Sequence, residues 1–228
     1  MNELSMHNPD IEITCWSAPS VAQNLALDDA MVQTASATGR HSLRFWWGGP
    51  PAVVVGFSEK PDQAVDPDAC RILGVDVLKR STGGGSVLQT AGVFNYSIVK
   101  PLDRMMDPRR AFRFGTDLII AVLDALGLPG QAEGISDVAI GGRKISGNAQ
   151  AQRCKALIVH GTLLVDFDYD FAEKVLKYPM REPGYRQGRS HREFLVCLRE
   201  LDVDISGIEQ KAIEAARLVY GINETAAA

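Results

Sequence analysis

The chain has 228 residues, of which 46% are hydrophobic and 23% are charged, and its formal net charge is −4. This composition is typical of a globular protein that buries a sizeable core, and the negative charge argues against a general nucleic-acid-binding protein. The longest apolar run, at residues 118–126, is broken by Asp124 and is too short for a membrane span, so we expect neither nucleic acid nor a membrane as partner.

The first hundred residues predict strands with helices between them. Residues 11–16 are rich in β-formers and predict a strand, and Ser20 is suited to cap a helix that runs to about Ala35. The turn sequence GGPP separates two β-rich runs. The other elements expected here are strands at 43–47, 52–57, 75–80 and 92–99 and a short helix at 68–73.

Helical periodicity begins at Pro108. Apolar residues then fall near one face, and Gly127 stands where a helix C′ glycine belongs. The residues placed on that face are Phe112, Ile119, Leu123 and Leu126.

The second half continues with strands and then helices. The sequence DVAIGGRKISGNAQ, residues 137–150, predicts a hairpin that turns at Gly141 and Gly142. The remaining expectations are a long buried strand at 156–167 and helices at 169–177, 190–198 and 206–221. We therefore expect an α/β fold of the α+β type, with mixed, mostly antiparallel sheets packed with helices in a single domain over residues 1–228.

Three successive glycines follow Arg80 in the segment RSTGGGSVLQTAGVFNYS, residues 80–97. Glycine weakens a strand, so Gly83, Gly84 and Gly85 indicate either a positive φ or another group close to the backbone. Consecutive N–H groups can cradle an anion there, and a guanidinium suits phosphate or carboxylate. The alternative is a tight turn without a ligand. The segment is not a P-loop, because no GxxxxGK[ST] is present and it leads to a strand.

Two later residues carry further chemistry. Lys144 follows the glycine pair of the hairpin, and Ile145 should face away from it, so one of the two lies on the core side. Lys144 would be a compact cation for a carboxylate beside a phosphate, or else a solvated hairpin charge. His160 and Gly161 lie inside an apolar strand, where a lone histidine is more often structural than catalytic.

Together these segments resemble the lipoate–protein ligase family, in the wider biotin/lipoyl protein ligase superfamily. The resemblance rests on RSTGGGSVLQTAGVFNYS, ISDVAIGGRKISGNAQ and HGTLL, with NLALDDA and WGGPPAVVVGFSEKP upstream, and covers about residues 11–200. It implies a biotin/lipoyl protein ligase-like catalytic domain with a core at 11–200 and a C-terminal helix at 206–221. The C-terminal accessory domain of the bacterial single-chain ligases is not expected, and a separate subunit is one way to supply it.

The resemblance implies a ligase that uses lipoate, ATP and Mg²⁺. The lipoate carboxylate attacks the α-phosphate of ATP, and a lysine of an acceptor lipoyl domain then takes the acyl group from lipoyl-AMP. The acceptor would be a 2-oxoacid dehydrogenase E2 or a glycine-cleavage H-like protein. The matching lysine, Lys144, is the implied catalytic residue, which neutralises the carboxylate and the α-phosphate. The residues implied in substrate or adenylate binding are Arg80, Ser81, Gly83, Gly84, Gly85, Asn95, Asp137, Gly147, His160, Gly161 and Thr162.

Some of these roles are more specific. Asp137 is the candidate on the metal side, and His160 and Gly161 would border the acyl tunnel. Two further sets are weighed against ordinary structural roles. The candidates for the acyl slot are Trp47, Val55 and Val87, and the candidates to meet phosphate or an acidic acceptor domain are Arg186, Arg189 and Arg192.

Related transferases of the same fold, which move octanoyl or lipoyl groups without ATP, carry the acyl group on a cysteine. In one group that cysteine shortly precedes the lysine motif, and in another it shortly follows the HGT strand. Residues 128–143 and 163–190 contain no cysteine, and Cys154 falls in an expected strand as a structural thiol. A biotin ligase is the other alternative, although RSTGGG favours lipoate. The four cysteines show no CxxC pair and no leader opens the chain, which favours a reduced, cytoplasmic setting.

Overall fold

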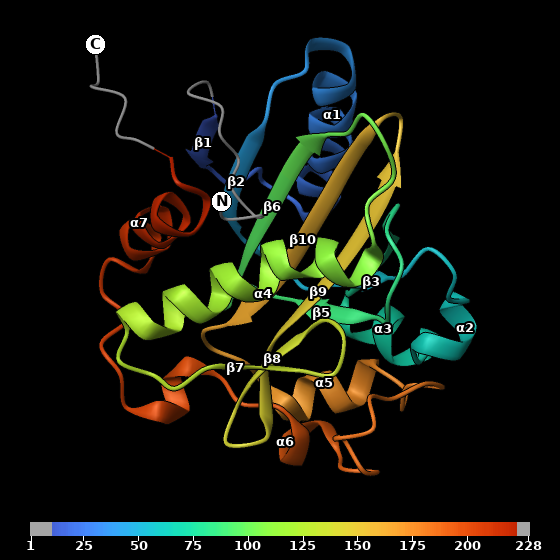
Figure 1. Cartoon of the computed structure of the whole chain (residues 1–228). Coiled ribbons are helices and arrows are strands. Elements are labelled where there is room, and N and C mark those ends of the chain that lie inside the picture. Colours follow the sequence, from blue (N-terminus) through green and yellow to red (C-terminus); the bar gives the residue numbers. More distant parts are fainter. Residues whose placement is uncertain (1–10, 223–228) are drawn as a thin grey trace.

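The computed structural model describes residues 11–222, which form two sheets packed with helices (Figure 1). The large sheet has the order β1-β2-β6-β10-β9-β8-β7 and the small sheet the order β4-β3-β5. Paired strands run antiparallel, except the parallel pairs β1/β2 and β3/β4. The predicted fold class is therefore confirmed. The strands are β1 (Glu12–Cys15), β2 (Ser42–Trp47), β3 (Ala52–Val55), β4 (Asp76–Lys79), β5 (Val87–Gln89), β6 (Val93–Pro101), β7 (Gln131–Glu133), β8 (Asp137–Ile140), β9 (Arg143–Arg153) and β10 (Ala156–Leu164).

The helices begin and end largely where local signals predict. Ser20 caps α1 by accepting a hydrogen bond from the Gln23 amide, and Gly127 follows α4 with a φ of 74°. The helices are α1 (Val21–Thr38), α2 (Pro61–Ala64), α3 (Pro67–Leu73), α4 (Pro108–Ala125), α5 (Tyr169–Val175), α6 (His191–Phe194) and α7 (Ile208–Tyr220), with a 3-10 helix at Leu198–Leu201.

The helix expected at 190–198 is interrupted. The α-helical part ends at Phe194, because the chain then runs alongside the start of β9. There the Val196 amide donates to the Lys144 carbonyl at 2.9 Å, and Leu195 forms a parallel bridge with Lys144. The segment after α6 is thus tied to the residue that the sequence singled out as catalytic.

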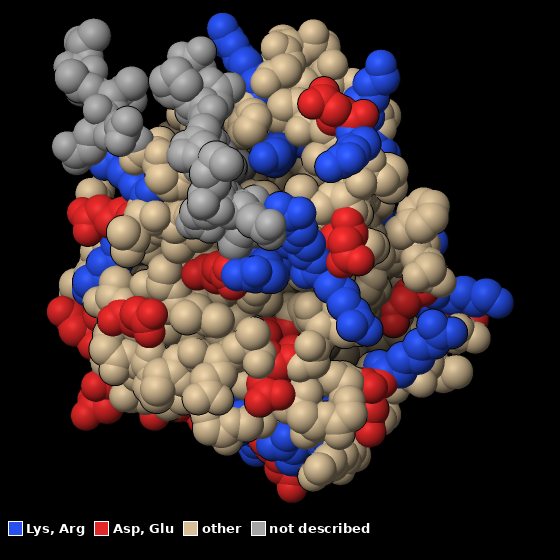
Figure 2. Space-filling model, viewed as in Figure 1, with Lys and Arg blue, Asp and Glu red and all other residues tan. Residues whose placement is uncertain are grey.

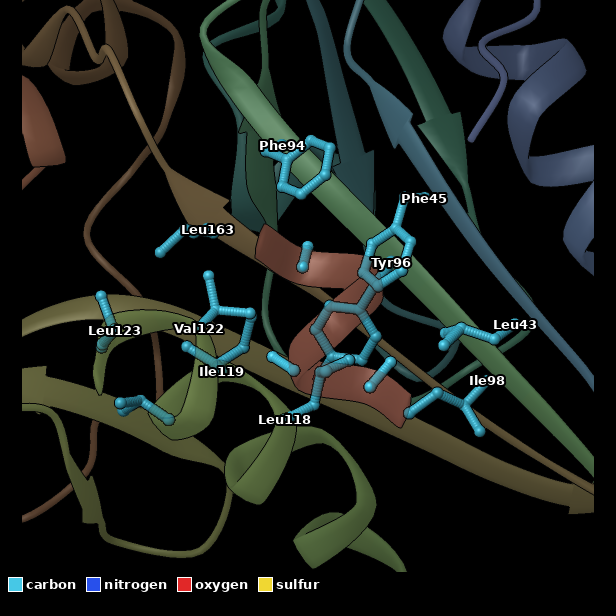
Figure 3. Packing of buried hydrophobic residues seen from close by; sticks show 14 of the residues in the cluster. Leu43, Phe45, Phe94, Tyr96, Ile98, Leu118, Ile119, Val122, Leu123 and Leu163 are labelled. Carbon is cyan, nitrogen blue, oxygen red and sulfur yellow. The ribbon is translucent and has the colours of Figure 1, made fainter. Parts of the chain in front are cut away.

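The main core lies between the large sheet and α4, with α7 packed beside α4 (Figure 1). Figure 3 shows side chains of β2 and β6, among them Phe45 and Tyr96, facing Leu118 and its neighbours on α4. The prediction for α4 needs one correction. Phe114 is fully buried in this core while Phe112 is only half-buried, so the buried face is rotated from the one expected.

The opposite face of the large sheet receives α1 and the small sheet. Val32 and Ala35 of α1 pack against Val99 and Ile158, while β3 and β5 pack near Val93. Side chains alternate along a strand, so residues of β6 and β10 that do not face α4 point to this second side. The strand register places four polar residues there, namely Asn95, Ser97, His160 and Thr162.

Two features of the described residues concern the surface, namely the length and apolar character of the helices and the distribution of charge on one face. Among residues 11–222, no helix combines the length and apolar character that a membrane span requires. Figure 2 shows Lys and Arg side chains interspersed with Asp and Glu over the face that α4 covers. The described part of this face therefore carries no continuous basic surface of the kind that nucleic-acid-binding proteins present.

Candidate active site

The glycine turn at residues 83–85 is held from inside by Arg80. The Nη2 group donates to the carbonyl oxygens of Gly83 at 2.6 Å and Gly85 at 2.7 Å, while Nη1 donates to the Val54 carbonyl at 3.2 Å. Burial lowers the pKa of Arg80 to about 10, so the side chain stays charged at neutral pH. Sequence reasoning expected this guanidinium to face a substrate anion. In the structure its contacts are to the turn, which it shapes.

The amide groups of the turn face away from Arg80. In a trans peptide the C=O and N–H point in opposite directions, so the N–H groups of Gly84 and Ser86 are directed away from the guanidinium. Within residues 11–222, no acceptor takes a hydrogen bond from the amides of residues 83–86. These amides can therefore donate to a ligand.

Only one of the three glycines is required by the backbone or by packing. Gly84 has a φ of 86°, in the left-handed region, where side chains other than glycine are strained. A Cβ atom on Gly83 or Gly85 would meet no atom within 4 Å. At these two positions the glycines leave open space, and the described fold gives no internal reason for it.

Lys144 is directed by a β-bulge. In the ladder between β8 and β9, Val138 pairs with Ser146 but Ala139 pairs with Lys144, so Ile145 is an extra residue on β9. Lys144 and Gly147 are three residues apart and would lie on opposite faces of a regular strand. The extra residue brings them to the same face. Ile145 is fully buried in the main core, and it faces away from Lys144, as predicted.

The amine of Lys144 forms an ion pair with Asp137 of β8, at a distance of 2.8 Å from Nζ to Oδ1. Gly147 makes room for it, because a Cβ atom there would lie 2.6 Å from Nζ. The Lys144 side chain is 27% exposed and that of Asp137 only 8%. The lysine is therefore neither an ordinary solvated charge nor a fully buried one, and it stays accessible to an anion.

The glycine turn and Lys144 lie on the same side of the large sheet. A Cβ atom on Gly84 would lie 3.8 Å from the Cβ atom of Ala149, and one on Gly147 would contact Lys144. Gly147 and Ala149 are two residues apart on β9, so they share a face and are roughly 7 Å apart. The fold thus brings together the two segments that the sequence singled out.

A residue that sequence reasoning did not select completes this group. Tyr185, in the loop after α5, donates a hydrogen bond from its hydroxyl to Asp137 Oδ2 at 2.9 Å. Burial raises the pKa of Tyr185, and the Asp137 carboxylate raises it further, so the phenol remains a neutral donor. A lone tyrosine in a polar loop carries no sequence signal for this role.

Among residues 11–222, the Asp137 carboxylate has two side-chain partners, Lys144 and Tyr185, and this bears on its predicted metal role. Among the described residues, no three His, Cys, Asp or Glu side chains come together as metal ligands. Mg²⁺ commonly binds one or two carboxylates plus substrate phosphates. The residues around Asp137 therefore fit a magnesium ion that arrives with a nucleotide better than a resident ion.

Two of the remaining polar candidates, His160 and Asn95, are hydrogen-bonded to neighbouring side chains. His160 Nε2 lies 2.6 Å from Thr82 Oγ1, a residue that sequence reasoning did not select. The amides of Asn95 and Gln89 pair in both directions, at 2.7 and 3.0 Å, and join the large sheet to β5. Thr162 lies between Asn95 and Gly147 in the strand register, on the same face.

The structure corrects the role expected for Gly161. It points to the α4 side, where a Cβ atom would overlap Asn148 Oδ1 and lie 2.8 Å from the ring of Tyr96. The glycine therefore makes room for these two side chains and does not face the side that carries Lys144.

The three apolar candidates for an acyl slot are ordinary packing residues. Trp47 packs on Phe94 and donates from its indole to Glu209 of α7 at 2.6 Å. Val55 lies in the core beneath the small sheet, and Val87 packs at the edge of a separate cluster around Trp46.

The three arginines of the late loop also have protein partners. Arg186 is buried, and its guanidinium lies 4.7 Å from the ring centre of Tyr178 and 4.9 Å from that of Phe194. Arg189 donates to the Gly142 carbonyl at 3.1 Å, and Arg192 pairs with Asp170 at 2.6 Å. These contacts tie the loop to the hairpin and to α5.

The sequence places Cys154 in a strand, and this prediction is wrong. It lies with Lys155 in the tight turn between β9 and β10, where both residues have positive φ, and it is exposed. Ten residues of extended strand separate it from Lys144, a distance of roughly 30 Å. A thiol there cannot share a reaction centre with that lysine.

Two pockets lie beside the residues around Lys144 and the glycine turn. One of about 250 Å³ lies between α1, the end of β4 and β10, and one of about 370 Å³ lies between α4 and residues 132–137. The first is lined by Ala22, Leu25, Ala26, Asp28, Asp29, Leu78, Lys79, Arg80, Ser81, Ile158 and His160.

The chain is similar in sequence to a known protein family and to several curated proteins. Residues 20–216 match the lipoyl protein ligase A/B catalytic domain. Lipoate-protein ligase A subunit 1 of Thermoplasma acidophilum is 30% identical over 89% of this chain and 78% of that protein. Octanoyltransferase LipM of Carboxydothermus hydrogenoformans is 32% identical over 73% of this chain and 69% of that protein. The chain spans 54% to 60% of the length of three other curated relatives.

Solved structures agree in fold. The bi-partite lipoate protein ligase of T. acidophilum, studied with its E2 lipoyl domain, aligns over 94% of this chain and 85% of its own, with a TM-score of 0.82 and 27% identity. A lipoate-protein ligase A bound with ATP aligns over 94% and 87%, with a TM-score of 0.80 and 27% identity. A biotin protein ligase of Leishmania major has a TM-score of 0.53 at 14% identity, over 93% of this chain and 74% of its own, which is a likeness of fold alone.

Proposed function

Because the chain belongs to the family of the lipoyl protein ligase A/B catalytic domain, we propose that it is an ATP-dependent lipoate–protein ligase. The observation that carries the proposal is the placement of Lys144 and the open amides of the glycine turn on one face of β9. Two anions, a carboxylate and a phosphate, must meet in such a reaction. A site that aims an ammonium group and free N–H donors at one region suits that task.

In the first step, the lipoate carboxylate attacks the α-phosphorus of ATP, and pyrophosphate leaves as the acyl–phosphate bond forms. Lys144 exchanges part of its contact with Asp137 for the incoming carboxylate and phosphate oxygens. The amides of residues 83–86 donate to phosphate oxygens, and the open space at Gly83 and Gly85 admits them. Tyr185 and Lys144 hold Asp137 on this side, where it can also meet the magnesium that accompanies the nucleotide.

In the second step, the ε-amine of an acceptor lysine attacks the acyl carbon and AMP leaves. The acceptor would be a lipoyl domain, as in the E2 lipoyl domain paired with the similar ligase of T. acidophilum. That ligase is bi-partite. The curated T. acidophilum protein that is 30% identical to this chain is named subunit 1. We therefore also propose that a separate subunit assists this chain.

A second candidate is cysteine-dependent octanoyl transfer, which the likeness to LipM favours. That chemistry needs a thiolate near the acyl group. Cys154 is roughly 30 Å along β9 from Lys144, and Cys70 and Cys197 are buried. Burial, together with Glu209, raises the pKa of Cys15 to about 11, which suppresses its thiolate at neutral pH. These positions favour the ATP-dependent reaction.

One assay separates the two candidates. The protein is incubated with lipoate, Mg-ATP and a lipoyl domain, and the acceptor is followed by intact mass. A ligase requires ATP and tolerates Cys154→Ser. Acceptor modification from an octanoyl-carrier donor without ATP, abolished by a single Cys→Ser change, would establish the transferase instead.

A further inference from the structure

Two neighbouring carboxylates of α1 reach the two residues that precede the glycine turn. Asp29 Oδ1 accepts a hydrogen bond from Ser81 Oγ at 2.7 Å, and Arg153 contacts both groups. Asp28 Oδ2 lies 3.3 Å from His160 Nδ1, and the other ring nitrogen of His160 lies 2.6 Å from Thr82 Oγ1. Neither carboxylate belongs to the group around Lys144.

The hydrogen bonds of the Asp28 chain have one consistent direction. The side chain of Asp28 is 3% exposed and pairs with Arg44 at 3.3 Å, so the carboxylate acts only as an acceptor. Because Asp28 is an acceptor, we assign a proton of His160 to Nδ1, and Nε2 then accepts from the Thr82 hydroxyl. Arg80 Nε donates to the same hydroxyl oxygen at 3.1 Å. Asp28, His160, Thr82 and Arg80 thus form a continuous relay that ends at the guanidinium under the turn.

The pocket of about 250 Å³ beside the relay is lined in part by Asp28, Asp29, Ser81 and His160. Apolar packing joins α1 to the small sheet next to this pocket. The hydrogen bonds that begin at Asp28 and Asp29 extend that contact to residues 81 and 82. The helix itself is anchored, because Val32 and Ala35 pack on the large sheet and Ser20 caps its start.

We propose that Asp28, acting through His160 and Thr82, and Asp29, acting through Ser81, are positioning residues that fix the glycine turn for its anionic substrate. The kinetic consequence rests on the proposed ligase function, whereas the structural consequence does not. These residues are not catalytic, because they act on the turn and not on the reacting atoms. Their effect is to keep the free amides aimed at the place where the phosphate is attacked.

The first test measures hydrogen exchange at an amide that is bonded to the turn. The Phe57 amide donates to the Thr82 carbonyl at 2.8 Å, so its hydrogen exchange reports how firmly the turn is held. Thr82→Val keeps the side-chain shape but removes the hydroxyl, and should speed exchange at Phe57 about tenfold, the effect expected for one net hydrogen bond. Thr82→Ser keeps the hydroxyl and should restore most of the protection. Amides in α4 that exchange by local opening, away from the turn, should not change.

The second test measures the tautomer of His160 and the rate of adenylate formation. Nitrogen-15 NMR of the wild type should show His160 protonated at Nδ1 and bare at Nε2. Thr82→Val should lower kcat for adenylate formation about tenfold and change the KM for lipoate less than about twofold. Asp117→Asn, which removes a half-buried carboxylate of α4 paired with Arg113, is the control and should change none of these values.

The outcomes separate the two proposals. Unchanged Phe57 exchange in Thr82→Val, or the opposite His160 tautomer, overturns the positioning role whether or not the protein is a ligase. If the wild type forms no adenylate from lipoate and ATP, the proposed function fails, and the exchange and tautomer measurements still decide the positioning role.

Discussion

Replacing Lys144 with methionine should separate catalysis from stability. Methionine has a similar length without the charge, so it leaves the Asp137 carboxylate with Tyr185 as its remaining hydrogen-bond donor. Because that carboxylate is only 8% exposed, we expect Lys144→Met to lower the free energy of unfolding by about 1–3 kcal/mol, the cost of leaving a buried acceptor poorly satisfied. Loss of one charge donor to the transition state should slow adenylate formation by about a hundredfold or more, or roughly 3 kcal/mol.

A double variant distinguishes these two effects. Asp137→Asn in the Lys144→Met background removes the stranded charge, so most of the lost stability should return. Activity should not return, because the ammonium is still missing. Urea denaturation gives the free energies, and lipoate-dependent ATP–pyrophosphate exchange gives the rate. If exchange stays near the wild-type rate in Lys144→Met, or recovers in the double variant, Lys144 does not have the role assigned to it.

Three further predictions test separate parts of the structure. Gly85→Ala should leave stability unchanged or raise it by up to about 1 kcal/mol, because its Cβ meets open space, but should slow adenylate formation at least about tenfold; unimpaired turnover would show that no ligand approaches there. Gly161→Ala should lower the free energy of unfolding by about 1–3 kcal/mol, because its Cβ collides with Asn148 and Tyr96, and a neutral result in urea denaturation would contradict this packing. Burial, with Lys100 and Arg186 nearby, lowers the pKa of His41 and His191 below the usual 6.5. The unfolded chain therefore binds protons that the folded chain does not, so stability should fall as pH drops below about 6.5. Asn at both positions should flatten this dependence in thermal denaturation at pH 7 and pH 5.5, and an unchanged slope would assign it to other groups.

Much of the secondary structure could be predicted because its signals are local. Ser20 caps the helix that follows it, and Gly127 ends α4 in the expected conformation. Gly141 and Gly142 both have positive φ and turn the hairpin between β8 and β9. In each case a few adjacent residues determine the backbone. The family resemblance drawn from three separate motifs is likewise confirmed by the match over residues 20–216.

The errors concern contacts between residues far apart in the sequence. The contacts of Arg80 depend on the carbonyl of Val54, and Gly161 is set by Tyr96 and Asn148 on the opposite side of the sheet. No pattern along one strand reports such neighbours. Neither Cys154 nor Lys155 is a usual turn residue, so their sequence carries no signal for the turn in which both adopt positive φ.

The orientation of Lys144 shows the same limit more sharply. Alternation predicted that it lies opposite Ile145, which is correct. It could not predict that a bulge would bring Lys144 to the side of Gly147 and Asp137, because a bulge is a property of two paired strands.

The central claim is that the glycine turn and Lys144 act on the same substrate anions. A crystal structure with a non-hydrolysable lipoyl-adenylate analogue tests it most directly. We predict that oxygens of its acyl–phosphate linkage accept hydrogen bonds from Lys144 Nζ and from at least one amide of residues 83–86. An analogue bound with Lys144 still paired only with Asp137, or with those amides facing solvent, would contradict it.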